Sequence, residues 1–196
     1  VANNNCGGSV MNSLGCSHGT IQGAIDHVEA YGEGGVVTIP IGTWDEELTI
    51  QDDAITLQGM GKGSILVPAD GTAISCNGDY DYVTIRDLAI DSKAATGGTA
   101  ISIGDGADYF LIDNVTIVDS DSQGITIHGA PSLTGGIVQN CVILGADNNG
   151  IQIEMDGGSY SYHIKIINNH ITSCGSNGIY LSSSGTGNYY TTISGN

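Results

Sequence analysis

Apolar residues return at a regular interval from residue 72 to the end of the chain. Three columns of them can be followed, each with spacings between 24 and 28 residues. The first column is Ile74, Ile101, Ile125, Ile151 and Ile179, the second is Ile85, Ile112, Val138, Ile166 and Ile193, and the third is Ile90, Ile117, Ile143 and Ile171. Around each column apolar and polar residues alternate, which is the pattern of short β-strands.

Each repeat holds three such segments, separated by turns rich in Gly, Asn and Asp. A repeat of about 26 residues cannot bury its own apolar face, but stacked repeats bury the faces of one another. The pattern therefore predicts an all-β fold, a three-faced parallel β-helix with about five to six coils. Leucine-rich repeats have a similar period, but their Leu-dense pattern and helical half-repeat are absent from this sequence.

The residues before position 72 fit the same solenoid. Three pairs supply the strands of an earlier coil and a fourth pair a partial one: Leu48/Ile50, Ile55/Leu57, Ile65/Val67 and Val37/Ile39. We therefore predict a single β-helix domain over residues 20–196, with coils over 36–196, preceded by a lead segment over residues 1–19.

One helix is predicted over residues 20–32, ahead of the first coil. Its apolar stripe consists of Ile21, Ala24, Ile25 and Val28. Thr20 is suited to cap its N-terminus, and a glycine at position 32 suits its C-terminal end. Such a helix would cover the open apolar end of the solenoid.

The other end of the solenoid shows no matching cap. The sequence stops at TTISGN, part-way through a coil and before the expected third strand. Open strand edges pair readily with other chains. We therefore expect self-association, or a larger assembly, through this end.

Composition narrows the classes of partner. The chain has 4 Lys and Arg against 21 Asp and Glu, which gives a formal net charge of -17. Four scattered cations cannot form the basic patch that nucleic acid or an anionic membrane surface requires. No apolar run approaches the roughly 20 residues of a membrane span. Few lysines and many aspartates favour an extracellular protein, at a cell surface or in a virion.

The five cysteines fall into different settings. We predict a local disulfide between Cys6 and Cys16 in the Gly-, Asn- and Ser-rich lead segment, which would fit an oxidising compartment. A metal site is the alternative, although His18 is the only imidazole near in sequence and no CxxC spacing is present. Cys76 and Cys141 stand on apolar positions and are expected to be buried, and the state of Cys174 stays open.

A second periodic feature is polar. Asp87, Asn114, Asn140 and Asn168 share one position in successive repeats. We interpret them as a structural ladder of inward-turned side chains, which would bond to one another and to the backbone between coils. A row of ligand-binding groups is the alternative interpretation.

Candidate chemistry lies on the outer face of the first strand of each repeat. His128 and Glu154 occupy the same position one coil apart, about 4.8 Å by strand spacing. A carboxylate beside an imidazole can position it as a general base, and Tyr180 could then act as an acid. Gln152, Tyr160 and Tyr162 are candidate ligand-binding residues. The alternative is that all of these are ordinary solvated surface residues.

Three carboxylates fall in turns beside this face: Asp119, Asp121 and Asp147. They are candidate calcium ligands, because Ca²⁺ takes oxygen donors. Aspartate is also a common turn former, so the cluster has a purely structural alternative. No other cofactor is expected.

The head of the chain carries the most specific motifs. In order they are TIQGAID, GGVVTIPIGTW, LTI, ITLQGMG and SILV, followed by coils with GIxI and IxNxxI patterns. Together they resemble the pectate-lyase-like right-handed β-helix superfamily over residues 20–196. That superfamily includes extracellular polysaccharide lyases, epimerases and viral tailspikes, and the later coils look like those of surface and periplasmic copper-site accessory β-helix proteins.

The resemblance implies a right-handed helix whose first-strand face binds sugar. It carries over no catalytic residue, because the lyase Arg motif, the Asp-Pro-His-Glu run and the Asn-Thr-Asp and Gly-His-Gly runs are all missing. This face also has no Lys or Arg to neutralise a uronate. Arg86 belongs to the second strand, where we expect Asp113 of the next coil to pair with it.

Two functions therefore stay open. The first is an extracellular structural or adhesive β-helix protein of a cell surface, filament or virion, which assembles with other chains and binds glycan. The second is a polysaccharide lyase, epimerase or hydrolase that acts on the first-strand face.

Overall fold

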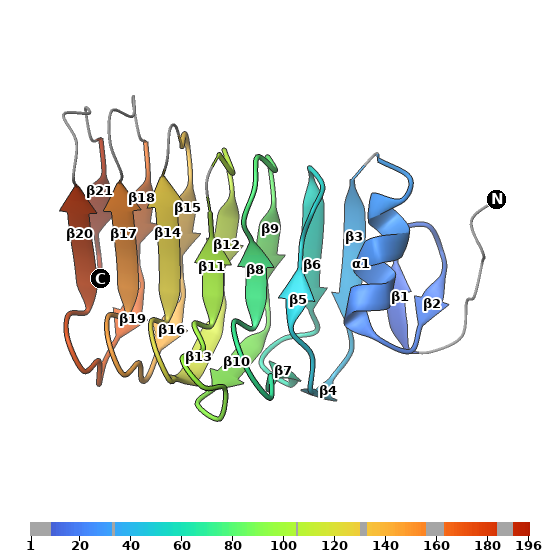
Figure 1. Ribbon diagram of the computed structural model, residues 1–196, viewed down its shortest axis with the longest axis horizontal. Coiled ribbons are helices and arrows are strands. Elements are labelled where there is room, and N and C mark those ends of the chain that lie inside the picture. Colours follow the sequence, from blue (N-terminus) through green and yellow to red (C-terminus); the bar gives the residue numbers. More distant parts are fainter. Residues whose placement is uncertain (1–8, 33, 105, 130–132, 156–162, 184–189) are drawn as a thin grey trace.

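The computed structural model is a solenoid of three β-sheets with one short helix at its N-terminal end (Figure 1). It describes residues 9–32, 34–104, 106–129, 133–155, 163–183 and 190–196. The three-faced β-helix predicted from the repeat is confirmed.

Each coil contributes one strand to each sheet. From β3 onward all strand pairs within the sheets are parallel, as coiling in one direction requires. Sheet A runs through β3 (Gly35–Ile39), β6 (Ile55–Gly59), β9 (Thr84–Arg86), β12 (Leu111–Asp113), β15 (Ile137–Gln139), β18 (Lys165–Ile167) and β21 (Thr192–Ser194). Sheet B runs through β4 (Gly42–Trp44), β7 (Ser64–Leu66), β10 (Ala89–Ser92), β13 (Thr116–Ser120), β16 (Val142–Ile143) and β19 (His170–Ile171). Sheet C runs through β5 (Leu48–Thr49), β8 (Ile74–Cys76), β11 (Ile101–Ile103), β14 (Ile125–Gly129), β17 (Ile151–Met155) and β20 (Ile179–Ser183).

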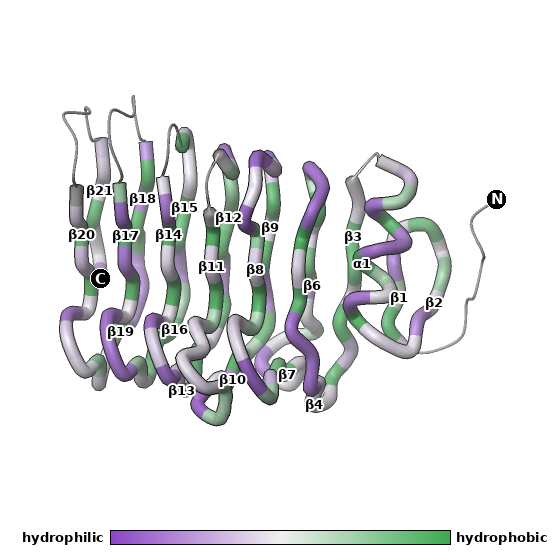
Figure 2. The backbone as a smooth tube through the Cα atoms, in the orientation of Figure 1, coloured by the Kyte–Doolittle hydropathy of each residue, from purple (hydrophilic) through white to green (hydrophobic). Residues whose placement is uncertain are grey.

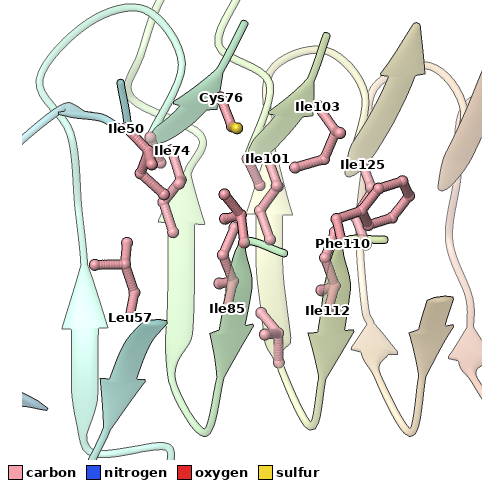
Figure 3. Packing of buried hydrophobic residues seen from close by; sticks show 14 of the residues in the cluster. Ile50, Leu57, Ile74, Cys76, Ile85, Ile101, Ile103, Phe110, Ile112 and Ile125 are labelled. Carbon is pink, nitrogen blue, oxygen red and sulfur yellow. The ribbon is translucent and has the colours of Figure 1, made fainter. Parts of the chain in front are cut away.

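Within the apolar columns, the residues of successive coils lie one on another, as predicted. Ile101 pairs with Ile125 and Ile125 with Ile151 in sheet C, while Ile112 pairs with Ile85 in sheet A. All five are fully buried. Figure 3 shows the side chains of Ile85, Ile101, Ile112 and Ile125 in the space between the sheets, and Figure 2 shows the alternation of hydrophobic and hydrophilic positions along the strands.

One strand has the opposite facing to the one expected. In β7, Ser64 and Leu66 are the buried residues, and the Ile65/Val67 pair is only partly buried. Burial of Ser64 is tolerated because its hydroxyl donates to the carbonyl of Ile39 at 2.8 Å and accepts from the amide of Met60 at 2.9 Å.

Helix α1 (Ile21–Glu29) covers the first coil, as predicted. Thr20 caps it by accepting a hydrogen bond from the amide of Gly23 at 3.1 Å. The predicted stripe is buried throughout: Ile21, Ala24, Ile25 and Val28. The helix thus closes the apolar N-terminal end of the solenoid against solvent.

A short hairpin completes this cap. Strands β1 (Val10–Asn12) and β2 (Ser17–His18) pair antiparallel, and β1 continues sheet A by pairing antiparallel with β3. Val10 is fully buried, so part of the lead segment belongs to the core. The predicted disulfide involves Cys6, which lies outside the described residues, and it stays a prediction.

The polar ladder occupies one position in successive coils, but its side chains are not turned inward. Asp87, Asn114, Asn140 and Asn168 all have φ between 53° and 58°. This left-handed backbone forms the turn from sheet A to sheet B and directs the side chains outward, so that the three asparagines are exposed.

The inward-facing asparagines stand one position later. Asn169 is 3% exposed. It accepts from the amide of Cys141 at 2.9 Å and donates to the carbonyl of Val138 at 3.1 Å. Asn196 repeats the pattern in the next coil by donating to the carbonyl of Ile166 at 3.0 Å. Asn169 is therefore the buried polar residue at this turn, and Asn196, which is exposed, makes the same kind of bond one coil later.

Core residues become exposed in the last described coil. Leu181 and Ile193 are 45% and 46% exposed, although they continue columns that are buried in earlier coils.

In the part of the chain that the structure describes, no helix combines the length and hydrophobicity needed to cross a bilayer.

Candidate functional site

The outer face of sheet C brings the predicted site residues together. His128 pairs in register with Glu154, and Gln152 pairs with Tyr180 of the following coil. These residues alternate with the buried isoleucines of β14 and β17, so the period-two pattern of the strands fixes their outward direction.

His128 and Glu154 form a close pair. Nδ1 of His128 lies 3.2 Å from Oε2 of Glu154, and the two side chains are 42% and 34% exposed. A carboxylate on Nδ1 fixes the orientation of the ring and leaves Nε2 for another partner. Among the described residues, no hydrogen bond to this Nε2 is found. The pair thus presents one imidazole nitrogen to a ligand.

Gln152 connects the pair to the interior. Its side-chain amide donates to Oε1 of Glu154, and its Oε1 accepts from Nδ2 of Asn149 at 2.6 Å. Gln152 is only 7% exposed. Its amide group is thus engaged by Glu154 and Asn149, and the prediction that Gln152 binds a ligand stays a prediction.

The network continues into a polar column that the sequence analysis did not single out. Asn149 accepts two hydrogen bonds from Asn177 of the next coil, each at 3.0 Å. On the other side, Gln123 approaches Gln152 at 3.4 Å and also receives the hydroxyl of Ser122. The signal was present in the sequence, since Gln123, Asn149 and Asn177 recur two residues before the first apolar column.

Polar side chains follow the face toward the N-terminus as well. Nδ2 of Asn77 donates to the hydroxyl of Ser75 at 2.7 Å, and the hydroxyl of Ser102 donates to Oδ1 of Asn77 at 3.1 Å. We call the row Ser75, Asn77, Ser102, His128, Glu154 and Tyr180 the polar strip. It is a strip of hydrogen-bonding groups on an elongated face, without Lys or Arg in the strands that carry it.

Tyr180 lies at the C-terminal end of the polar strip. It is 41% exposed and stands beside Gln152 in the strand register. The other two candidate ligand-binding residues, Tyr160 and Tyr162, lie outside the described residues.

The candidate calcium ligands surround a lysine. Nζ of Lys93 bonds Oδ1 of Asp147 and lies 3.9 Å from Oδ1 of Asp119. Asp121 instead accepts the amide of Gly97 at 2.7 Å. The pKa of Lys93 is raised, first by the hydrogen bond to Asp147 and further by the three carboxylates. A calcium ion would have to displace this ammonium group, so the calcium site stays a prediction.

A histidine pair lies under the N-terminal cap. Nδ1 of His27 is 2.9 Å from Nε2 of His18, and the ligand atoms of Cys16, His18 and His27 lie within 4.8 Å of one another. Burial, and then the charge of His27, lowers the pKa of His18. His27 is 9 positions away in sequence, and helix α1 brings it to His18, which the sequence analysis did not foresee.

The prediction that Asp113 pairs with Arg86 is wrong. Its guanidinium donates to Oε1 of Gln58 in the preceding coil at 2.9 Å. Asp113 instead accepts from Nδ2 of Asn140 in the following coil at 2.8 Å. Although Arg86 and Asp113 are register partners, no ion pair joins these two described residues.

The chain belongs to the right-handed β-helix family. Residues 53–196 match the family described as "Right handed beta helix region", which is more than half of the chain. Among curated protein sequences, none matches the chain.

Two solved structures share the fold. The A-module of mannuronan C-5 epimerase AlgE4 from Azotobacter vinelandii is 21% identical, with a TM-score of 0.57 over 81% of this chain and 54% of that one. The tailspike protein gp49 of the Acinetobacter baumannii bacteriophage Fri1, a capsular polysaccharide depolymerase, is 13% identical, with a TM-score of 0.64 over 89% of this chain and 45% of that one. The chain thus spans about half the length of these structures, and at such identities the likeness concerns the fold alone.

Proposed function

We propose that this protein is an extracellular polysaccharide-binding β-helix of a cell surface or virion, and that the polar strip is its glycan-binding face. The observation that carries the proposal is the hydrogen-bonded network that holds His128 and Glu154 outward on a rigid sheet. Both structural neighbours, the epimerase and the depolymerase tailspike, act on polysaccharides, and this supports the same class of ligand.

The chemistry of the polar strip suits sugar hydroxyls. Hydroxyl, amide, imidazole and carboxylate groups along it can donate and accept hydrogen bonds in turn. Because neighbouring strands lie about 4.8 Å apart, equivalent groups of successive coils repeat along the polar strip at that interval. The strands of sheet C contain no Lys or Arg and the formal net charge is -17, which favours an uncharged glycan over a polyuronate.

A second function is favoured by one specific observation. The orientation of the His128 ring by Glu154 resembles the arrangement of a general base held by a carboxylate, with Tyr180 one coil further on as the proton donor. This would suit a lyase or an epimerase. It ranks second because the charge that develops beside a uronate carboxylate needs a cation, and the sheet C strands supply none.

Glycan binding is tested by affinity electrophoresis in gels that contain neutral or uronate polysaccharides. We expect neutral glycans to retard the wild type. Tyr180→Ala and Glu154→Gln should each weaken the retardation about tenfold, which is the equivalent of one lost hydrogen bond or ring contact. Tyr31→Ala is the matched control, because Tyr31 is 50% exposed and follows helix α1, outside the strands that carry the polar strip.

The same variants separate binding from catalysis. If His128→Ala abolishes an unsaturated or epimerised product that the wild type forms, the enzymatic alternative replaces the binding proposal. Equal retardation of the wild type, Tyr180→Ala and Glu154→Gln contradicts a binding role for the polar strip.

A further inference from the structure

Three asparagines of the chain are followed directly by glycine: Asn77, Asn149 and Asn177. An asparagine in this setting can lose its side-chain amide, because the backbone nitrogen of the next residue can attack the side-chain carbonyl carbon. Glycine favours the attack, since it has no Cβ to hinder the approach and adopts more backbone conformations than other residues. The reaction needs an accessible side chain and a backbone N–H that no hydrogen bond holds.

Asn77 and Gly78 meet both conditions. They stand in the turn that follows β8, and the side chain of Asn77 is exposed. Its hydrogen bonds go to the hydroxyls of Ser75 and Ser102 on the outer face, and exposed bonds of this kind contribute little net free energy. Among the described residues, no acceptor is found for the N–H of Gly78. The two reacting atoms are therefore available without opening of the fold.

Asn149 and Gly150 meet neither condition. Asn149 is 8% exposed, and its Nδ2 donates to Oε1 of Gln152 at 2.6 Å. The N–H of Gly150 donates to the carbonyl of Asn177 at 2.9 Å. Both bonds would have to break in a local opening before the nitrogen could attack. This pair is thus an internal reference with the same two residue types.

The remaining asparagines show that exposure alone is not sufficient. Asn177 is exposed, but its backbone N–H and its Nδ2 both donate to Oδ1 of the buried Asn149 at 3.0 Å. Asn140 is exposed as well, but the N–H of the following Cys141 is held by a hydrogen bond at 2.9 Å. Only the Asn77 side chain combines exposed hydrogen bonds with an unbonded glycine N–H in the part of the chain that the structure describes.

We propose that Asn77 is a self-modification site of the polar strip, which converts without an enzyme to aspartate and isoaspartate. The nitrogen of Gly78 bonds to Cγ of Asn77, the bond from Cγ to Nδ2 breaks, and the proton of the Gly78 N–H leaves with Nδ2 as ammonia. Water then adds to either carbonyl of the cyclic imide. Breaking the new bond to Cγ gives aspartate, and breaking the original peptide bond gives isoaspartate. Water is consumed, ammonia is released, and no electron is transferred.

The modification changes the chemistry of the polar strip. Nδ2 of Asn77 donates to Ser75, whereas a carboxylate only accepts, so this position loses a donor and gains a negative charge. The hydroxyl of Ser102 can still donate to the carboxylate. Isoaspartate in addition lengthens the backbone by a methylene group directly after β8. This site goes beyond the proposed glycan binding and does not depend on it.

The test follows the intact, folded chain during incubation in mildly alkaline buffer below its unfolding temperature. Peptide mass spectrometry measures the amide lost at each asparagine, and chromatography separates isoaspartate from aspartate peptides. In the folded protein, Asn77 should react at least about tenfold faster than Asn149, because only Asn149 needs a local opening. In denaturant the rates of these two asparagines should become similar, since both are followed by glycine.

Asn77→Gln is the matched variant. It keeps the side-chain amide, but the extra methylene group disfavours closure of the ring, so the peptide that carries position 77 should keep its mass. Asn140 is the reference within the wild type for an exposed asparagine whose following N–H is bonded, and it should stay intact over the same time. Circular dichroism checks that the variant is folded.

The proposal is supported if isoaspartate accumulates at Asn77 in the folded protein while Asn149 and Asn140 stay intact. Equal rates at Asn77 and Asn149 in the folded protein overturn it. Loss of the Asn77 amide without any isoaspartate also overturns it, because the cyclic imide opens at both carbonyls. A mass change that persists in the same peptide of Asn77→Gln would place the reaction at another residue.

Discussion

At the scale of single residues, burial separates three thiols. Cys76 and Cys141 take the place of larger side chains in the apolar columns, where they are 0% and 1% exposed. Loss of hydration raises the pKa of each to about 12, because an apolar interior disfavours the thiolate. Cys174 is only partly buried, and burial raises its pKa as well.

This order predicts selective alkylation. Since the thiolate is the reactive form, iodoacetamide at about pH 8 should modify Cys174 in the folded protein, faster as the pH rises, and leave Cys76 and Cys141 intact. Peptide mass mapping over time measures it, and the same reaction in denaturant should modify all three.

Cys174→Ser is the control for this experiment. It should abolish the fast modification and leave the modification rates of Cys76 and Cys141 unchanged. Modification of Cys76 at the rate of Cys174 in the folded protein would contradict the burial of Cys76 in β8.

Single positions also show why the polar ladder was predicted in the right place but facing the wrong way. The period fixes that Asn114 and Asn140 follow one another in successive coils, and a sequence can reveal that. Their direction depends on φ near 54°, which rotates the side chain out of the alternating pattern of the strands. Asn169, one position later, returns to that pattern and is buried.

At the scale of elements, helix α1 is held in place by side chains of the first coil. The carboxylate of Glu46 accepts the amides of Ile21 at 2.9 Å and Gln22 at 3.0 Å, where the helix leaves its first donors unpaired. Gln22 in turn bonds both backbone groups of Thr49, at 2.8 and 3.0 Å. The helix thereby substitutes for a neighbouring strand at the open edge of β5.

Glu46→Ala should destabilise the protein by about 1–2 kcal/mol, because two helix amides lose a charged acceptor. Urea unfolding followed by circular dichroism measures this. Glu47→Ala is the matched control, since Glu47 is the exposed neighbour and no hydrogen bond is found for it among the described residues. An equal loss in the two variants would mean that the cap contributes nothing beyond general charge.

The elements themselves follow closely from sequence. Isoleucine columns repeat because each coil must present a side chain of similar volume to the one below, so strand positions and the cap helix could be predicted. The facing of β7 could not, because Ser64 is buried only by virtue of hydrogen bonds to Ile39 and Met60. The same holds for the site. The period places His128 over Glu154, but the hydrogen bonds of Gln152 depend on side-chain positions that the repeat does not specify.

At the scale of the whole molecule, the charge works against the solenoid. The formal net charge is -17, and the charges of Asp79 and Asp81 act on Asp108 of the following coil. Burial, together with neighbouring carboxylates, raises the pKa of Glu29 and of Asp108. The folded chain therefore binds these protons more tightly than the unfolded chain. Their stabilising contribution is present at low pH and is lost as the pH rises through the folded-state pKa.

Salt should consequently stabilise the protein, and more so at high pH. Raising NaCl from about 0.01 M to about 1 M shortens the screening length from about 30 Å to about 3 Å. We expect the midpoint of thermal unfolding to rise with salt at about pH 8 and to change little near the sequence pI of about 4.1. The reason is that repulsion between carboxylates is large only when they are ionised.

Two controls distinguish screening of charge repulsion from binding of a specific cation. Choline chloride in place of NaCl should raise the midpoint of thermal unfolding equally, because screening does not depend on the identity of the cation. EDTA should leave the effect of NaCl on the midpoint unchanged. Asp108→Asn keeps an acceptor for Thr134 but removes one charge, so it should raise the midpoint at low salt and lose that advantage at high salt. A rise that appears with NaCl alone would indicate a bound cation instead of relief of repulsion along the stacked coils.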